Sequence, residues 1–155
     1  MNSFKYAINQ AKSEIIEKHL LQCSELFSPA LDTYVSIPDY SKKIKDNAIT
    51  VEAWNSGELI GLVACYLNND RTREGHITNV SVIHAFQGRG IAKQLIRNTI
   101  EEALRKNYKT LTLEVEIDNK HAIELYRQSG FVLNGRLGSK YLMINRLLEN
   151  KNVLV

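Results

Sequence analysis

Apolar residues alternate along seven stretches of the chain and recur at helical spacing along four others. The alternating stretches predict strands at residues 4–8, 49–54, 59–66, 75–82, 111–116, 131–133 and 141–144. The helical spacing predicts a helix that begins at Ser13, and helices over residues 39–46, 90–106 and 119–129. In chain order this gives β-α-α-β-β-β-α-β-α-β-β, which is a mixed α/β fold class.

Turn-forming residues separate the predicted elements. Asn55-Ser56-Gly57-Glu58 joins two of the strands as a hairpin. Pro29 and Pro38 predict that residues 26–38 contain a loop, because proline interrupts regular structure. Gly130 is expected to end the fourth helix at the C′ position, with Phe131 packing back onto that helix.

Length and composition are typical of one soluble domain. The 155 residues are 44% hydrophobic and 24% charged, and we expect a domain over residues 1–147 followed by a tail over 148–155. The net charge of +3 is small and the basic residues are spread out, which argues against a nucleic-acid partner. No segment resembles a membrane span or signal peptide, and the two cysteines and four histidines show no metal-ligand spacing. We therefore expect a cytoplasmic protein without a metal.

The segment most suggestive of function is Gln87-Gly88-Arg89-Gly90-Ile91-Ala92, between the strand at 75–82 and the helix at 90–106. A strand, a glycine-bearing turn and a helix N-terminus present free backbone N–H groups at the positive end of the helix dipole. The glycines allow a ligand to approach the backbone, and Arg89 and Lys93 add positive charge. The segment is therefore predicted to bind a phosphate-bearing ligand.

Two common phosphate-binding motifs do not fit this segment. The P-loop pattern is absent from the chain. The dinucleotide pattern fails because Lys93 stands where its third glycine belongs. A general nucleotide-binding module is accordingly a weaker interpretation.

The turn does match Q/R-x-x-G-x-G/A, with Gln87, Gly90 and Ala92 on its defined positions. Downstream, a strand of the form L-x-V is followed by N-x-x-A-x-x-L-Y-x-x-x-G-F, formed by Asn119, Ala122, Leu125, Tyr126, Gly130 and Phe131. In order and spacing the two motifs resemble those of the GNAT N-acetyltransferase superfamily. The resemblance is good over residues 48–136 and loose over the first 47.

This resemblance implies a mixed sheet of about seven strands with about four helices, and acetyl-CoA in a wedge between the splayed fourth and fifth strands. The turn at 87–92 would bind the pyrophosphate, and the backbone at Val80 and Val82 would pair with the pantetheine amides. Asn119 would contact the pantetheine arm, and Tyr126 would reach the sulfur. The implied function is direct transfer of an acetyl group to a primary amine.

Transfer to an amine requires a neutral nitrogen, so a base is useful. Glu114 is the first candidate, because in this family a glutamate at that position occurs in protein N-terminal acetyltransferases. His76 is the second, at the position of a catalytic glutamate in the histone-type enzymes, and Glu116 is a substitute for either. Each has a structural alternative: Glu114 as a solvated strand residue, His76 as an exposed polar residue, Tyr126 as a core aromatic and Asn119 as an N-cap.

The acceptor is left open among a small amine, an amino sugar and a protein N-terminus. Phe27, Asp32, Tyr34 and Tyr40 lie in a segment that in this family borders the acceptor pocket. The structural alternative is that the aromatic residues among them fill the core beside the sheet. The rival to an enzyme is a non-catalytic acyl-CoA-binding regulatory domain on the same fold. A homodimer is a further open alternative.

Overall fold

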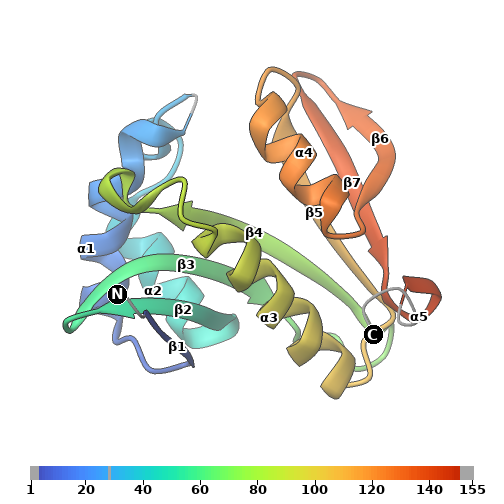
Figure 1. Cartoon of the computed structure of the whole chain (residues 1–155), viewed down its shortest axis with the longest axis horizontal. Helices are drawn as coiled ribbons and strands as arrows, with labels where there is room; N and C mark the ends of the chain where they lie inside the picture. The colour runs from blue at the N-terminus through green and yellow to red at the C-terminus, as the bar shows by residue number, and fades with distance from the viewer. Residues whose placement is uncertain (1–3, 28, 151–155) are drawn as a thin grey trace.

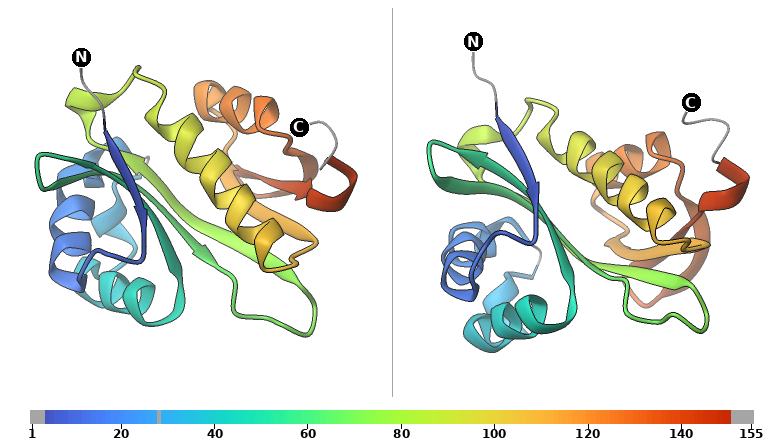
Figure 2. Two further views of the ribbon diagram at one scale, coloured as in Figure 1. Left: turned by 60° about the horizontal axis from the view of Figure 1, so that its bottom comes forward. Right: turned by 90° about the horizontal axis from the view of Figure 1, so that it is seen from below.

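A single seven-stranded sheet crosses the protein, with helices on both of its faces (Figures 1 and 2). The computed structural model describes residues 4–27 and 29–150. The strand order is β1-β2-β3-β4-β5-β7-β6, and the pairs are antiparallel except for β4 with β5. The strands are β1 (Lys5–Ile8), β2 (Ile49–Asn55), β3 (Glu58–Tyr66), β4 (Glu74–Val82), β5 (Thr110–Glu116), β6 (Val132–Leu137) and β7 (Lys140–Arg146).

The helices follow the predicted order, with one short helix added at the end. They are α1 (Ser13–Cys23), α2 (Ile37–Asn47), α3 (Ile91–Arg105), α4 (Lys120–Gln128) and α5 (Leu147–Asn150). Three 3₁₀ turns occur at Ser24–Leu26, Leu31–Thr33 and His84–Phe86. The tail expected from residue 148 thus begins within α5, and residues 151–155 lie outside the described residues.

Two apolar layers hold the helices against the sheet. α1 and α2 cover one face of β2–β4, and α3 covers the other (Figure 2). Gly61 on β3 lets α3 approach closely, because a Cβ there would lie 2.9 Å from the Leu95 Cδ1 atom. α4 packs into the same core as α3, through Tyr126.

The second helix starts earlier than the sequence predicts. It was expected over residues 39–46, and it spans Ile37–Asn47. Pro38 lies in its first turn, where a backbone N–H has no helical partner and a fixed φ favours the helix. Ser36 caps this turn by accepting a hydrogen bond from the Asp39 N–H at 3.4 Å. The expectation that Pro38 interrupts regular structure was therefore wrong.

The final hairpin is longer than predicted. Strands expected at 131–133 and 141–144 extend over Val132–Leu137 and Lys140–Arg146. A register shift between Leu133 and Gly135 breaks the alternation on which the shorter prediction rested. Gly138, with a φ of 59°, makes the turn.

The predicted end of the fourth helix is confirmed. Gly130 has a φ of 99°, and its N–H donates to the Arg127 carbonyl at 3.1 Å. The Phe131 N–H donates to the Tyr126 carbonyl at 3.0 Å, which completes a Schellman motif. Phe131 is buried, and its ring packs edge-on against Tyr126 at 6.0 Å.

A fully buried carboxylate, Glu52 on β2, holds the segment before α1 against the sheet. It accepts hydrogen bonds from the Ala11 N–H at 2.9 Å, the Gln10 N–H at 3.1 Å, the Thr50 hydroxyl at 2.6 Å and the Trp54 indole N–H at 3.0 Å. Four donors replace the water that the carboxylate loses on burial.

We expect Glu52→Gln to lower the free energy of unfolding by about 1–3 kcal/mol, because the amide NH₂ would face a donor that the carboxylate satisfied. Urea unfolding monitored by circular dichroism measures the change. Glu58→Gln, at an exposed position at the start of β3, is the control and should stay within about 0.5 kcal/mol of native. Equal stability of the two variants would show that Glu52 holds no essential hydrogen bonds.

Candidate active site

β4 and β5 pair over only three residues and then diverge, which opens a wedge in the middle of the sheet (Figure 1). The register ends at His76 opposite Thr112. Beyond that point, β4 remains paired with β3, and β5 remains paired with β7. The inner edges of both strands are therefore open toward one another.

The backbone of β4 directs hydrogen-bonding groups into this wedge. The Ile83 N–H donates to the Ile60 carbonyl at 2.8 Å, so the backbone N–H of residue 83 points toward β3. Because alternate residues of a strand point to opposite edges, the amides of Val80 and Val82 point toward the open side. The Gln87 side-chain amide donates to the Val82 carbonyl at 3.2 Å, which agrees with a Val82 backbone that points away from β3.

The turn at 87–92 follows at the end of β4. Gly88 and Gly90 both have a φ of 78°, and a Cβ on either would have no neighbour within 4 Å. The first helical donor is the Gln94 N–H, which bonds the Gly90 carbonyl at 3.1 Å. The N–H groups of the preceding helical residues have no intrahelical acceptor. The turn therefore offers free donors and open space beside a helix N-terminus, which suits a pyrophosphate.

Positive charge lies beside this turn. Arg89 is exposed, and its guanidinium lies 5.3 Å from the centroid of the Phe86 ring. Phe86 in turn packs edge-on against Phe4 at 5.9 Å. Ile91 anchors the first turn of α3 in the core, and Ala92 is half-buried. The predicted donor-binding segment is thus rigid on its inner side and open on its outer side.

The structure brings both candidate bases to the closed end of the wedge. His76 Nδ1 lies 2.8 Å from the Thr112 hydroxyl, and Glu114 is two residues further along β5 on the same face. Burial lowers the pKa of His76, and the nearby charge of Glu114 opposes that effect. Glu114 is exposed, and its carboxylate forms no ion pair with any described residue. The two side chains are therefore neighbours on one face of the sheet, at the start of the wedge.

Tyr126 lies on α4 with its ring buried against Phe131. Burial raises the pKa of Tyr126 to about 12. Its hydroxyl makes no hydrogen bond to a residue in the described part of the chain. A phenol that stays protonated and is not bonded within the protein is suited to donate to a ligand.

Asn119 caps α4, which is the structural role that was considered for it as an alternative to binding. Its side-chain oxygen accepts a hydrogen bond from the Ala122 N–H at 3.2 Å. The NH₂ group of this exposed amide is not used by the cap. A contact of Asn119 with the pantetheine arm stays a prediction.

Lys140, which no sequence motif indicated, lies near Tyr34 and Glu116 at the outer end of the wedge. The Lys140 ammonium lies 5.8 Å from the centroid of the Tyr34 ring. Lys140 is also the register partner of Glu116 across β5 and β7. Burial raises the pKa of Tyr34, and the charge of Glu116 raises it further. Since these residues lie far apart in the sequence, no local pattern links them.

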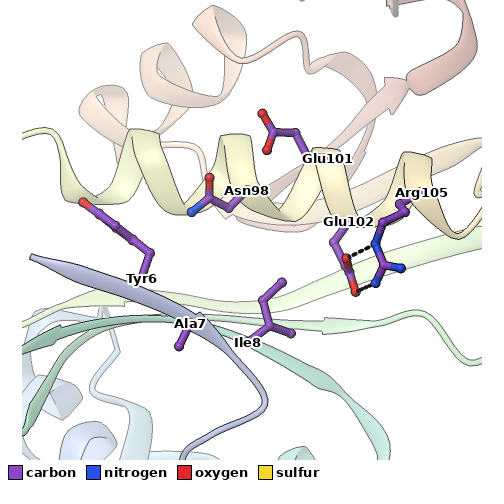
Figure 3. Close-up of a pocket in the computed structure, with 7 residues that line it drawn as sticks. All are labelled: Tyr6, Ala7, Ile8, Asn98, Glu101, Glu102 and Arg105. Carbon is purple, nitrogen blue, oxygen red and sulfur yellow. Dashed lines mark hydrogen bonds and ion pairs between the residues drawn. The ribbon is translucent and has the colours of Figure 1, made fainter.

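Depressions also occur away from the wedge. One of about 320 Å³ lies between β1 and α3, bordered by Tyr6, Asn98 and Glu101 (Figure 3). Two of its charged groups are paired with each other, because Glu102 and Arg105 form an ion pair at 2.7 Å. None of the predicted site residues lines this depression.

Comparison with known proteins agrees with this geometry. The acetyltransferase (GNAT) family model matches residues 13–131. The chain belongs to this family. Acetyl-CoA is the acetyl donor of GNAT enzymes, and the seven-stranded mixed sheet of this GNAT domain is the predicted fold. No helix among the described residues is long and apolar enough to cross a membrane.

Curated relatives are similar in sequence to part of the chain. N-alpha-acetyltransferase MAK3 of Arabidopsis thaliana is 35% identical over 91 residues, which are 58% of this chain and 48% of that protein. N-alpha-acetyltransferase 30 of Saccharomyces cerevisiae is 32% identical over 85 residues, 54% of this chain and 48% of that protein. The chain thus spans about half the length of these curated relatives.

Solved GNAT structures share the fold over nearly the whole chain. The PaiA N-acetyltransferase of Thermoplasma acidophilum, in complex with coenzyme A, has a TM-score of 0.73 at 15% identity and covers 92% of this chain and 99% of its own. A chain of the NatC complex bound to Gag peptide and CoA has a TM-score of 0.68 at 22% identity, covering 94% and 99%.

We expect coenzyme A to raise the melting temperature of the native protein but not that of Gly90→Glu, whose carboxylate would occupy the anion position. Differential scanning fluorimetry measures both shifts. Gly57→Glu is a matched control, because Gly57 has a similar φ of 81° and equal open space but lies in the β2–β3 turn. Stabilisation of Gly90→Glu equal to that of Gly57→Glu would place the coenzyme elsewhere.

Proposed function

We propose that this GNAT domain transfers the acetyl group of acetyl-CoA directly to a primary amine. The observation that carries the proposal is the convergence at the wedge. An anion-binding turn follows β4, free β4 amides point into the opening, and two proton acceptors, His76 and Glu114, stand at its closed end. These are the groups that thioester-to-amine transfer requires.

The donor half of the site would be made mainly of backbone. The N–H groups of the turn, with Gly88, Arg89 and Gly90, would bind the pyrophosphate. The Val80 and Val82 amides would pair with the pantetheine amides as an added strand. An N–H near Val82 is also placed to stabilise the negative charge that develops on the thioester oxygen.

Glu114 is proposed as the base, and His76 as its neighbour in the site. The Glu114 carboxylate is exposed, whereas the His76 ring is half-buried and hydrogen-bonded to Thr112. The Glu114 charge also attracts the ammonium form of an amine before the proton leaves. His76 is the alternative base, because its lowered pKa keeps it neutral at pH 7.

A cationic acceptor suits the charge of the open wedge better than a phosphate-bearing one. Glu114 and Glu116 both lie on the β5 face of the opening, and Lys140 is the cation at its outer end. A nucleotide-linked amino sugar would bring its diphosphate close to the two carboxylates, which is unfavourable. This observation disfavours the amino-sugar nucleotide.

Among cationic acceptors, we propose a protein or peptide N-terminus. Support comes from the curated relatives, which are named as N-alpha-acetyltransferases, and from the NatC structure bound to a peptide. Chemistry supports it as well, because an α-amino group has a pKa of about 8 and is partly neutral at pH 7. An exposed carboxylate is therefore a more adequate base for an α-amino group than for an alkylamine, whose pKa is higher.

A screen of thiol release from acetyl-CoA tests the proposal. Short peptides with a free N-terminus, their N-terminally blocked forms, spermidine and a nucleotide-linked amino sugar are compared at equal concentration. We expect turnover with the free peptides and none with the blocked ones. Turnover with the sugar nucleotide alone would contradict the acceptor, and coenzyme A binding without turnover of any amine would favour a regulatory domain.

We expect Glu114→Gln to lower kcat/KM for the peptide by roughly 10²- to 10⁴-fold, since it removes the proposed base without removing a buried group. His76→Ala should have a mild effect. If His76 is the base instead, kcat/KM of the native enzyme should fall as the pH drops through a value below 6.5, because protonated histidine accepts no proton. Severe loss in His76→Ala with normal Glu114→Gln would reverse the assignment.

We expect Tyr126→Phe to lower kcat by about 10- to 10³-fold while acetyl-CoA affinity barely changes. The phenol would donate a hydrogen bond to the departing thiolate, and that bond strengthens as charge develops on sulfur. Because Phe keeps the packing against Phe131, the melting temperature should stay within a few degrees of native. An unchanged kcat would make Tyr126 a core aromatic only.

A further inference from the structure

The two ends of the turn at 87–92 are held by contacts with the rest of the fold. At its start, the Gln87 N–H donates to the His84 carbonyl at 3.2 Å, and the Gln87 side-chain amide donates to the Val82 carbonyl at 3.2 Å. At its end, the buried Ile91 side chain anchors the first turn of α3 in the core. The chain therefore enters and leaves the turn at fixed positions.

The middle of the turn has fewer restraints. Arg89 lies between Gly88 and Gly90, which both have a φ of 78° and open space where a Cβ would stand. Glycine has more backbone freedom than any other residue, so fixing this segment costs conformational entropy. No carboxylate in the described part of the chain pairs with Arg89. Its guanidinium carbon lies instead 5.3 Å from the centroid of the Phe86 ring, a cation–π contact.

The ring of Phe86 is itself held in place. Phe86 ends the 3₁₀ turn His84–Phe86, and its N–H donates to the Ile83 carbonyl at 2.8 Å. Its ring packs edge-on against the Phe4 ring, with centroids 5.9 Å apart and planes at 83°. Both rings pack against the main apolar core. Because Phe4 directly precedes β1, the beginning of the first strand supports the segment that leads into α3 (Figure 2).

A guanidinium held in this way is prepared for an anionic ligand. Arginine stays protonated and donates charge-assisted hydrogen bonds to phosphate oxygens. A free arginine side chain samples many rotamers, and a ligand that binds it must restrict them. An Arg89 side chain that already contacts Phe86 loses less of this freedom when a phosphate binds. The contact also restrains the backbone between the two glycines.

We propose that Phe86 is a positioning residue of the coenzyme site, whose ring, supported by Phe4, holds the Arg89 guanidinium and the glycine-flanked middle of the turn ready for the phosphates of acetyl-CoA. This inference rests on the proposed role of the turn at 87–92 as the anion site. It adds a source of coenzyme affinity that lies outside the glycine motif itself.

The test measures the dissociation constant of coenzyme A by isothermal titration calorimetry, without any acceptor amine. Phe86→Leu keeps an apolar side chain but removes the ring, and it should raise the dissociation constant about 3- to 10-fold. Phe86→Tyr keeps the ring and should stay within about 2-fold of native. Phe4→Leu should have a smaller effect than Phe86→Leu, because Phe4 acts only through Phe86.

A double-mutant cycle with Arg89 separates positioning from general damage to the fold. Arg89→Gln should raise the dissociation constant about 10- to 100-fold, since a charge-assisted hydrogen bond to phosphate is lost. If Phe86 acts through Arg89, adding Phe86→Leu to Arg89→Gln should change the dissociation constant by less than about 2-fold. The difference between native and Phe86→Leu should also shrink as the salt concentration rises, because exposed charges are screened.

Tyr66→Leu is the matched control for loss of a ring that contacts a cation. The Lys43 ammonium lies 5.9 Å from the centroid of the Tyr66 ring. Tyr66 ends β3 and pairs with His76, whereas the turn follows the opposite end of β4. This variant should leave the dissociation constant of coenzyme A within about 2-fold of native. Melting temperatures without ligand confirm that every variant is folded at the temperature of the titration.

Two results would overturn the inference alone. A native dissociation constant in Phe86→Leu would show that Arg89 needs no support from the ring. An equal effect of Phe86→Leu in the native and Arg89→Gln proteins would show that Phe86 supports the fold and not Arg89. If Gly90→Glu binds coenzyme A as tightly as Gly57→Glu, the coenzyme binds elsewhere, and the proposed anion site fails together with this inference.

Discussion

The three-residue ladder between β4 and β5 is the constraint on which the site depends. A parallel pair normally continues as long as both strands last, so its early end needs support from outside. β5 finds that support in β7, with which it pairs along all seven of its residues. β4 is held on its other side by β3. With their outer edges satisfied, the two strands can leave their inner edges open.

The two sides of the wedge differ in what they are made of. On the donor side, glycines with positive φ, helix N–H groups and the β4 edge present backbone atoms. On the side where we propose that the acceptor binds, the side chains of Glu114 and Glu116 come from β5 and that of Lys140 comes from β7. Backbone can bind one constant ligand in many proteins, whereas an acceptor that varies requires side chains.

This difference explains which features could be predicted from the sequence. The turn at 87–92 and the cap at Gly130 are local, because a few adjacent residues determine the backbone, and both were anticipated. Contacts between distant residues were not anticipated: Lys140 on β7 and Tyr34, in the segment between α1 and α2, come together only in the folded chain. The start of α2 was missed because Pro38 has opposite meanings in a first turn and in a helix interior. Alternation failed in β6 at its register shift.

The buried polar residues escaped prediction for a related reason, and they have a common effect. Glu52 bonds Ala11 across 41 residues of sequence, and His19 bonds Ser81 across 62. Read alone, each is an ordinary polar residue of a strand or helix. Together they fix both the entrance and the middle of α1 against the sheet. Since polar groups buried in this way are costly to leave unpaired, α1 has one register on the sheet.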